Sequence, residues 1–133
     1  MADSVRVPIE SDADVVTARQ EARAMGTELG FSSTDLTLLT TAISEVARNI
    51  TAYAGSGEIA LRVVHLRGRE GIEVVASDAG PGIANVDLAL QDGYTTGNGL
   101  GLGLPGARRL VDEFELDTAP GAGTRVRLVK WRG

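Results

Sequence analysis

The fold of this chain is decided by residues 32–64, SSTDLTLLTTAISEVARNITAYAGSGEIALRVV, because the spacing of their hydrophobic residues changes once. In the first part the apolar residues recur every three or four positions, as on one face of a helix; they are Leu36, Leu39, Ile43, Val46 and Ile50. Ser32 and Asp35 resemble a capping box at the start of this helix, with Asp in place of the usual Glu. After residue 57 apolar and polar residues alternate, as in a half-buried strand. A long helix that leads directly into a strand indicates a mixed α and β fold.

The segments on both sides continue this alternation of helices and strands. We expect an edge strand at 5–9, a helix from Ser11 or Asp12 to Gly30, a strand at 72–77, a short helical turn at 86–90, a helix from Pro105 to about Glu113, and strands at 115–118 and 124–130. No repeat or linker interrupts them, so residues 1–133 are expected to form a single domain. The predicted class is α+β, a two-layer sandwich with helices on one face of a mixed, mostly antiparallel sheet.

The composition excludes several kinds of function. The 13 basic and 18 acidic residues give a net charge of −5, which argues against a general nucleic-acid surface. No apolar run reaches the ~20 residues that span a bilayer, and the N-terminus lacks the pattern of a secretory signal. We therefore expect no membrane contact and a cytoplasmic location. The absence of cysteine excludes disulfides and thiolate chemistry, and the one histidine, His65, cannot form a catalytic triad by itself.

Glu45 and Asn49 are the first candidate functional residues. They are four residues apart, so their side chains lie on one face of the predicted helix, at the edge of its apolar stripe. Their oxygens suit Mg²⁺, and the carboxylate of Glu45 could accept a proton from an attacking hydroxyl. Taken alone, however, the spacing is more typical of a solvated helix flank.

The second candidate is the segment Asp78-Ala79-Gly80-Pro81-Gly82, which follows directly after a predicted strand. A carboxylate at this position can accept a hydrogen bond from an exocyclic amine. Gly80 and Gly82 would let a flat heterocycle approach the backbone, because they carry no Cβ. A simple turn from strand to loop explains the same residues equally well.

The third candidate is residues 93–106, GYTTGNGLGLGLPG. Such a segment can fold over a ligand, offer N–H groups to phosphates and lead into a helix N-terminus. It is neither a Walker A loop, because no Lys-Ser or Lys-Thr ends it, nor a dinucleotide fingerprint, because no βαβ strand precedes it. Lys130 is the only lysine, so a bound polyphosphate would depend on metal, backbone N–H groups and arginines. A flexible hairpin tip is the alternative.

In this order and spacing, the three candidates resemble the motifs of the GHKL (Bergerat-fold) ATP-binding family of gyrase, Hsp90, histidine kinases and MutL. The N box corresponds to residues 45–49, the first glycine box to residues 78–83, the second to residues 99–104, and the final Gly-Thr to Gly123 and Thr124. Within that family the chain is most similar to the small single-domain serine kinases of bacterial partner switching. Anti-sigma kinases are the nearest relatives of that group.

The resemblance implies a role for each matching residue. Glu45 would be the general base, Asn49 would hold Mg²⁺, and Asp78 would bind the amino group of adenine, supported by Thr124. The other ATP-binding residues implied are Gly80, Gly82 and Ile83 at the base, and Gly97, Gly99, Leu100, Gly101, Leu102 and Gly103 in a lid over the phosphates. Because residues 93–98 contain no basic side chain, the group that neutralises the γ-phosphate besides Mg²⁺ is open. Arg48 and Arg108 are the candidates.

The function implied is a serine/threonine-protein kinase of a stress pathway, with ATP and Mg²⁺. It would phosphorylate a serine of an STAS-domain antagonist within a stressosome and, on release, activate a PP2C-type phosphatase. One alternative is an anti-sigma kinase that sequesters a sigma factor. Another is a non-catalytic binding module gated by ATP.

Overall fold

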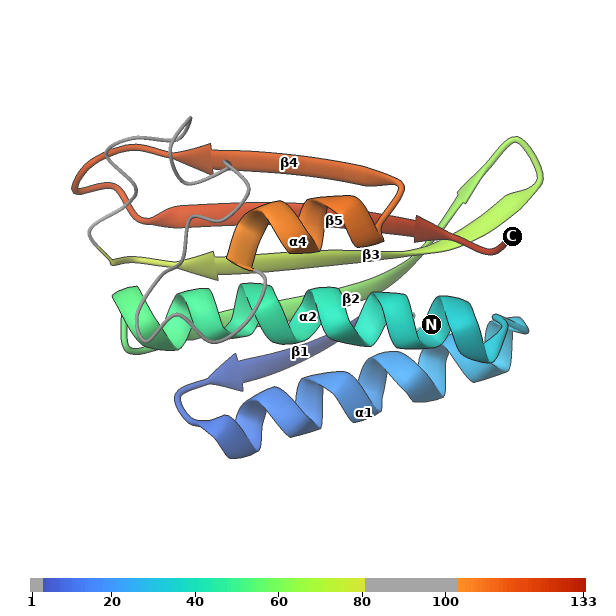
Figure 1. The fold of residues 1–133 in the computed structure, drawn as a ribbon, viewed down its shortest axis with the longest axis horizontal. Coiled ribbons are helices and arrows are strands. Elements are labelled where there is room, and N and C mark those ends of the chain that lie inside the picture. Colours follow the sequence, from blue (N-terminus) through green and yellow to red (C-terminus); the bar gives the residue numbers. More distant parts are fainter. Residues whose placement is uncertain (1–3, 81–102) are drawn as a thin grey trace.

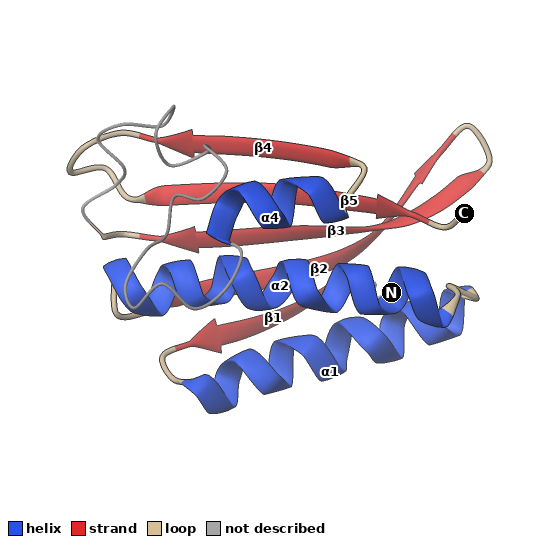
Figure 2. Ribbon diagram, viewed as in Figure 1, coloured by secondary structure: helices blue, strands red, loops and turns tan. Residues whose placement is uncertain are grey.

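The protein folds as a helical layer on one face of a sheet, as the computed structural model describes it for residues 4–80 and 103–133 (Figure 1). The elements are β1 (Ser4–Ile9), α1 (Asp12–Leu29), α2 (Ser33–Tyr53), β2 (Gly57–Leu66), β3 (Arg69–Asp78), α4 (Gly103–Leu110), β4 (Glu113–Thr118) and β5 (Thr124–Trp131). All three described helices lie on the same side of the strands (Figure 2). The predicted α+β sandwich is therefore confirmed. None of the described helices is long and apolar enough to cross a membrane.

The described strands form one sheet in the order β1-β2-β3-β5-β4, and each neighbouring pair is antiparallel. β2 and β3 are longer than predicted because they pair along their whole length, from Gly57 opposite Asp78 to Leu66 opposite Arg69. Their two-residue turn has positive φ at both positions, 53° at Arg67 and 79° at Gly68. Such turns match the right-handed twist of the strands they join.

Two predicted boundaries are corrected by the structure. α4 spans Gly103–Leu110 instead of Pro105 to about Glu113, and β4 begins at Glu113 instead of Glu115. Glu113 joins the strand because it pairs with Val129 and its carboxylate accepts a hydrogen bond from the indole N–H of Trp131 at 2.9 Å. This contact is non-local, so helical periodicity gives no sign of it. The helical turn predicted at 86–90 lies outside the described residues.

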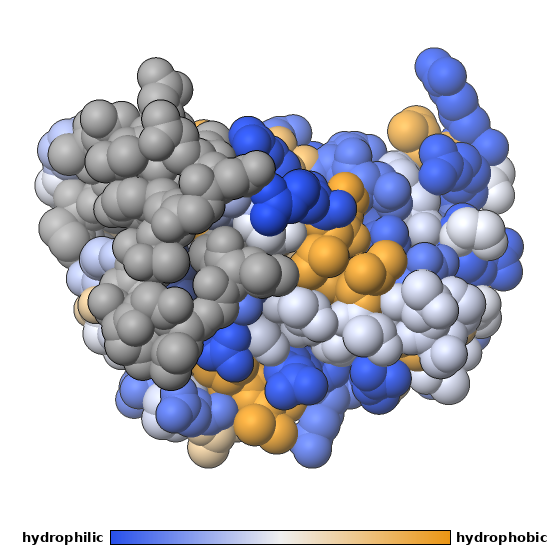
Figure 3. All heavy atoms as spheres, in the orientation of Figure 1, coloured by the Kyte–Doolittle hydropathy of each residue, from blue (hydrophilic) through white to orange (hydrophobic). Residues whose placement is uncertain are grey.

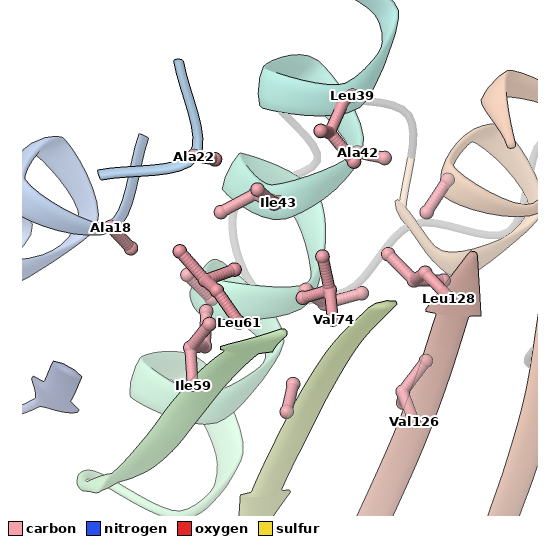
Figure 4. Close-up of a cluster of buried hydrophobic side chains, with 14 of the residues drawn as sticks. Ala18, Ala22, Leu39, Ala42, Ile43, Ile59, Leu61, Val74, Val126 and Leu128 are labelled. Atoms are coloured by element: carbon pink, nitrogen blue, oxygen red, sulfur yellow. The ribbon is translucent and has the colours of Figure 1, made fainter. Parts of the chain in front are cut away.

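The core lies between the helices and the inner face of the sheet (Figure 4). Alternate strand residues point into it, as the sequence pattern predicts; fully buried ones include Ile59, Leu61, Ile72, Val74 and Leu128. α1 contributes small residues every four positions, Ala18, Ala22 and Gly26. A Cβ at Gly26 would overlap the side chain of Leu36. The small residues thus let α2 pack close to α1, with its apolar stripe on the sheet.

The surface of the helical layer is mixed in character. Figure 3 shows apolar atoms at the surface between α4 and the first half of α2. Leu110 and Val111, at the end of α4, pack against the core but are only partly buried. Hydrophilic atoms and atoms of intermediate hydropathy border them (Figure 3).

The other face of the sheet carries no described helix and is covered by long charged side chains. Glu73 is buried there and pairs with Arg62 at 2.9 Å and Arg127 at 2.7 Å. Arg127 in turn pairs with Glu113 at 3.4 Å and Glu115 at 3.1 Å. These pairs connect β2, β3, β5 and β4 across the strands, and they cover an apolar residue of the same face, Val129. These ion pairs therefore cover this face of the sheet with charged side chains.

Candidate functional site

Glu45 and Asn49 are both buried on α2, with exposed fractions of 8% and 7%. They are not on a solvated helix flank, so the alternative favoured by their spacing alone is wrong. A carboxylate of this burial needs compensation by partners, and Oε2 of Glu45 accepts a hydrogen bond from Nη1 of Arg48 at 3.2 Å. Arg48 itself points to the exposed side of the helix. α2 therefore places an acid and an amide at the rim of the core.

Four residues on neighbouring strands form a row across one end of the sheet. The C-terminus of α2 lies at the same end. The strand register aligns Gly57 with Asp78, Asp78 with Thr124, and Thr124 with Thr118. Each is an even number of residues from a core residue of its own strand, so all four lie on the helix-covered face. We call these residues the end row. They bring Asp78 and Thr124 together, as the predicted base-binding edge requires.

Close packing joins the end of α2 to the end row. A Cβ at Gly57 would lie 2.8 Å from Cγ2 of Ile50 and would overlap the carbonyl oxygen of Ser77. A Cβ at Gly80 would lie 2.6 Å from Cβ of Ala54, the residue that caps α2. Ile50 directly follows Asn49 in the helix, so these contacts bring Asn49 and Asp78 to the same end of the molecule.

Asp78 ends β3 and shapes the turn that follows. Its Oδ1 accepts a hydrogen bond from the backbone N–H of Gly80 at 2.9 Å, an Asx-turn of the kind that Asp favours. No donor among the described residues bonds to its other carboxylate oxygen. Gly123 closes in from β5: its φ is 82°, and a Cβ there would overlap the carbonyl oxygen of Asp78. The backbone around Asp78 is thus held by contacts that only glycine permits.

Thr118 is a residue of this site that the sequence analysis missed. Its hydroxyl donates to the carbonyl oxygen of Gly123 at 2.9 Å and lies 3.0 Å from the hydroxyl of Thr124. The strand register could have found it. Residues 119–123 form the last turn, and the residues on its two sides, Thr118 and Thr124, are opposite each other in the antiparallel pair. That register was not worked out from the sequence.

Most of the other predicted ATP-binding residues fall between residues 81 and 102, which the structure does not describe. Gly82, Ile83, Gly97, Gly99, Leu100, Gly101 and Leu102 lie outside the described residues, and Gly103 is described only as the first residue of α4. α4 packs against α2 through buried Leu104 and Ala107. Arg108 and Arg48, the two candidates for the γ-phosphate, are both exposed.

The donor set on α2 fits Mg²⁺ only as an ion shared with a ligand. Within residues 4–80 and 103–133, no three acidic or histidine side chains gather into a metal site. Asn49 supplies an amide oxygen and Glu45 a carboxylate as possible ligands, and both are buried. Mg²⁺ commonly binds through one or two protein groups together with phosphates and waters. The residues therefore fit a magnesium ion carried by a nucleotide.

Comparison with known proteins agrees with this geometry. Residues 9–130 match the family model described as histidine kinase-like ATPase domain. The chain is 47% identical over 131 residues to the serine/threonine-protein kinase RsbT of Bacillus subtilis, covering 98% of each chain. It is 34% identical over 122 residues to an anti-sigma F factor of Caldanaerobacter subterraneus, covering 87% of this chain and 84% of that one.

A solved structure of the RsbU and RsbW domains of a Mycobacterium tuberculosis protein matches 99% of this chain and 34% of the other, with a TM-score of 0.65. At 19% identity this likeness shows the fold alone. The sequence comparisons show the family as well as the fold, because the match to RsbT covers nearly the whole chain at 47% identity. The chain therefore belongs to the histidine kinase-like ATPase domain family and, within it, to the serine/threonine-protein kinases of the RsbT type.

Proposed function

We propose that this kinase binds ATP with Mg²⁺ between the C-terminal half of α2 and the end row, and transfers the γ-phosphoryl group to a serine of an STAS-domain antagonist. The observation that carries the proposal is the burial of Glu45 and Asn49 on the helix whose end packs against the strand end of Asp78. An acid and an amide thus lie on a helix whose C-terminal end packs beside a second carboxylate.

At the base, Asp78 is the acceptor for the amino group of adenine, with Thr124 beside it on β5. Gly80 packs closely on Ala54, where a Cβ would lie 2.6 Å from the Cβ of Ala54, so a larger residue would not fit at this edge. Gly82 and Ile83 complete the base pocket in the proposal. Gly97, Gly99, Leu100, Gly101, Leu102 and Gly103 cover the phosphates, and the N-terminal end of α4 is the natural place for their charge.

At the phosphates, Glu45 acts as general base. It accepts the proton of the serine hydroxyl, the serine oxygen bonds to the γ-phosphorus, and the bond from that phosphorus to the bridging oxygen breaks, leaving ADP. Asn49 would hold Mg²⁺, which neutralises phosphate charge when bound. Arg48 orients the carboxylate of Glu45 through their 3.2 Å contact. Positioning of this kind supplies most of the catalysis in phosphoryl transfer.

The partner proteins are proposed from the resemblance to the partner-switching kinases. We propose an STAS-domain antagonist within a stressosome as the substrate, and a PP2C-type phosphatase as the target that the kinase activates after release. The support is the 47% identity to RsbT over almost the whole chain. The 34% identity to an anti-sigma F factor favours a second candidate, a kinase that sequesters a sigma factor.

Radiolabelled ATP tests the proposal. The purified chain is incubated with the STAS protein encoded nearest to its gene, and label on a serine is the expected result. Glu45→Gln should abolish the label, whereas Glu21→Gln, on the exposed face of α1, should leave it unchanged. ATP binding with no label on any partner would indicate a non-catalytic module gated by ATP. Capture of a sigma subunit without an STAS protein would favour the second candidate.

A further inference from the structure

The contact between Thr118 and Thr124 fixes the direction of one hydroxyl in the end row. The two residues are opposite each other where residues 119–123 connect β4 to β5, and their hydroxyl oxygens are 3.0 Å apart. Thr124 is 7% exposed and lies beside Asp78 in the strand register. A group bound at that edge therefore contacts the hydroxyl of Thr124, and the hydrogen bond with Thr118 decides whether this hydroxyl donates or accepts.

Counting the hydroxyl protons shows whether Thr124 donates or accepts. A threonine hydroxyl has one proton to donate and two lone pairs to accept. Thr118 directs its proton to the carbonyl oxygen of Gly123, at 2.9 Å. The proton between the two hydroxyls must then come from Thr124. With its only proton committed to Thr118, Thr124 can offer only lone pairs to a ligand.

Asp78 has the same character. Its ionised carboxylate only accepts hydrogen bonds, and its Oδ1 already accepts one from the N–H of Gly80 at 2.9 Å. The base-binding edge made by Asp78 and Thr124 is therefore an acceptor-only edge. Such an edge attracts an amino group and repels a carbonyl oxygen, because a buried acceptor that faces another acceptor is left without a partner.

We propose that Thr118 is a positioning residue that sets the nucleotide specificity of this kinase, by holding the hydroxyl of Thr124 as an acceptor. The substrate class selected is 6-amino purine nucleotides over 6-oxo purine nucleotides. This inference rests on the proposed binding of ATP at the end row. Without Thr118, the hydroxyl of Thr124 would be free to turn and donate its proton to a carbonyl oxygen.

The test compares ATP with inosine triphosphate, which carries a carbonyl oxygen in place of the amino group and an N–H in place of the bare ring nitrogen beside it. Calorimetry gives the Kd of each nucleotide for the wild type, Thr118→Val and Thr118→Ser. In Thr118→Val the preference for ATP should fall about three- to tenfold, the worth of one hydrogen bond. Thr118→Ser keeps the hydroxyl and should keep the wild-type preference. Thr124→Val, which removes the acceptor itself, should lower the preference as well.

The outcomes separate this inference from the proposed function. Equal preference in the wild type and a folded Thr118→Val would overturn the role of Thr118 while leaving ATP binding intact. A parallel loss of affinity for both nucleotides would also overturn it, since that is the result of a merely structural threonine. If the wild type binds neither nucleotide, the proposed function itself is wrong. Should Thr118→Val not fold, Thr118→Ala removes the same hydroxyl and is measured in its place.

Discussion

The guanidinium of Arg48 lies 3.2 Å from the carboxylate of Glu45, one helical turn apart on α2, with Glu45 buried and Arg48 exposed. The pair joins the interior of the site to its surface. It also gives Arg48 a described contact with the proposed base.

Arg48→Ala should reduce the rate of phosphoryl transfer about three- to tenfold with little change in ATP affinity, because the carboxylate of Glu45 loses an orienting partner. Stability should change by less than about 1 kcal/mol, since one partner of the pair is exposed to solvent. Single-turnover labelling and nucleotide titration check the two parts. If ATP affinity falls as much as the rate, Arg48 contacts the nucleotide directly.

Asp78→Asn should weaken ATP binding about 10- to 100-fold, because the amide replaces a charged acceptor and brings its own donor to the amine of adenine. Asp117→Asn, an exposed residue of β4, is the matched control and should leave the Kd unchanged. Calorimetry measures both. Wild-type affinity in Asp78→Asn would show that the base binds elsewhere.

Gly57→Ala should destabilise the protein by about 1–3 kcal/mol, because the new Cβ must displace the carbonyl of Ser77 and the side chain of Ile50. Ser56→Ala, an exposed neighbour, should have almost no effect. Urea unfolding of the three proteins provides the free energies. Nucleotide binding should fall together with stability in Gly57→Ala, since Gly57 belongs to the end row.

Glu73→Gln should cost roughly 1–3 kcal/mol of stability, because it removes the charge of the buried Glu73 and leaves Arg62 and Arg127 with a weaker partner. Glu58→Gln breaks an exposed pair with Arg6 and should cost less than about 0.5 kcal/mol. Equal losses in the two variants would contradict the special position of Glu73.

The pKa of Arg127 is raised above its ordinary value, mainly by its hydrogen bond with Glu73. A raised pKa stabilises the fold at every pH below the value of the unfolded chain, and this contribution is lost only as pH rises through the folded value. The contribution of Arg127 should therefore stay constant from pH 6 to 9. Urea unfolding of Arg127→Gln and the wild type across that range should give a constant difference.

The sequence by itself determined the elements and their order. The stripe along α2, the alternation in β2 and β3 and the glycine that ends α1 are local patterns, each set by the helical or strand period and by backbone geometry. The resemblance to the ATP-binding family also needed only the order and spacing of short motifs. The fold class and the family were both predicted from these features and are confirmed.

Only the tertiary structure decided which residues meet. The spacing of Glu45 and Asn49 fits a solvated flank as well as a site, and their burial depends on how α2 packs on the sheet. The partners of Glu73 are 11 and 54 residues away along the chain and come together only through the register of two strand pairs. Thr118 was missed for the same reason. Register depends on the packing of whole faces, a long-range property that no local pattern contains.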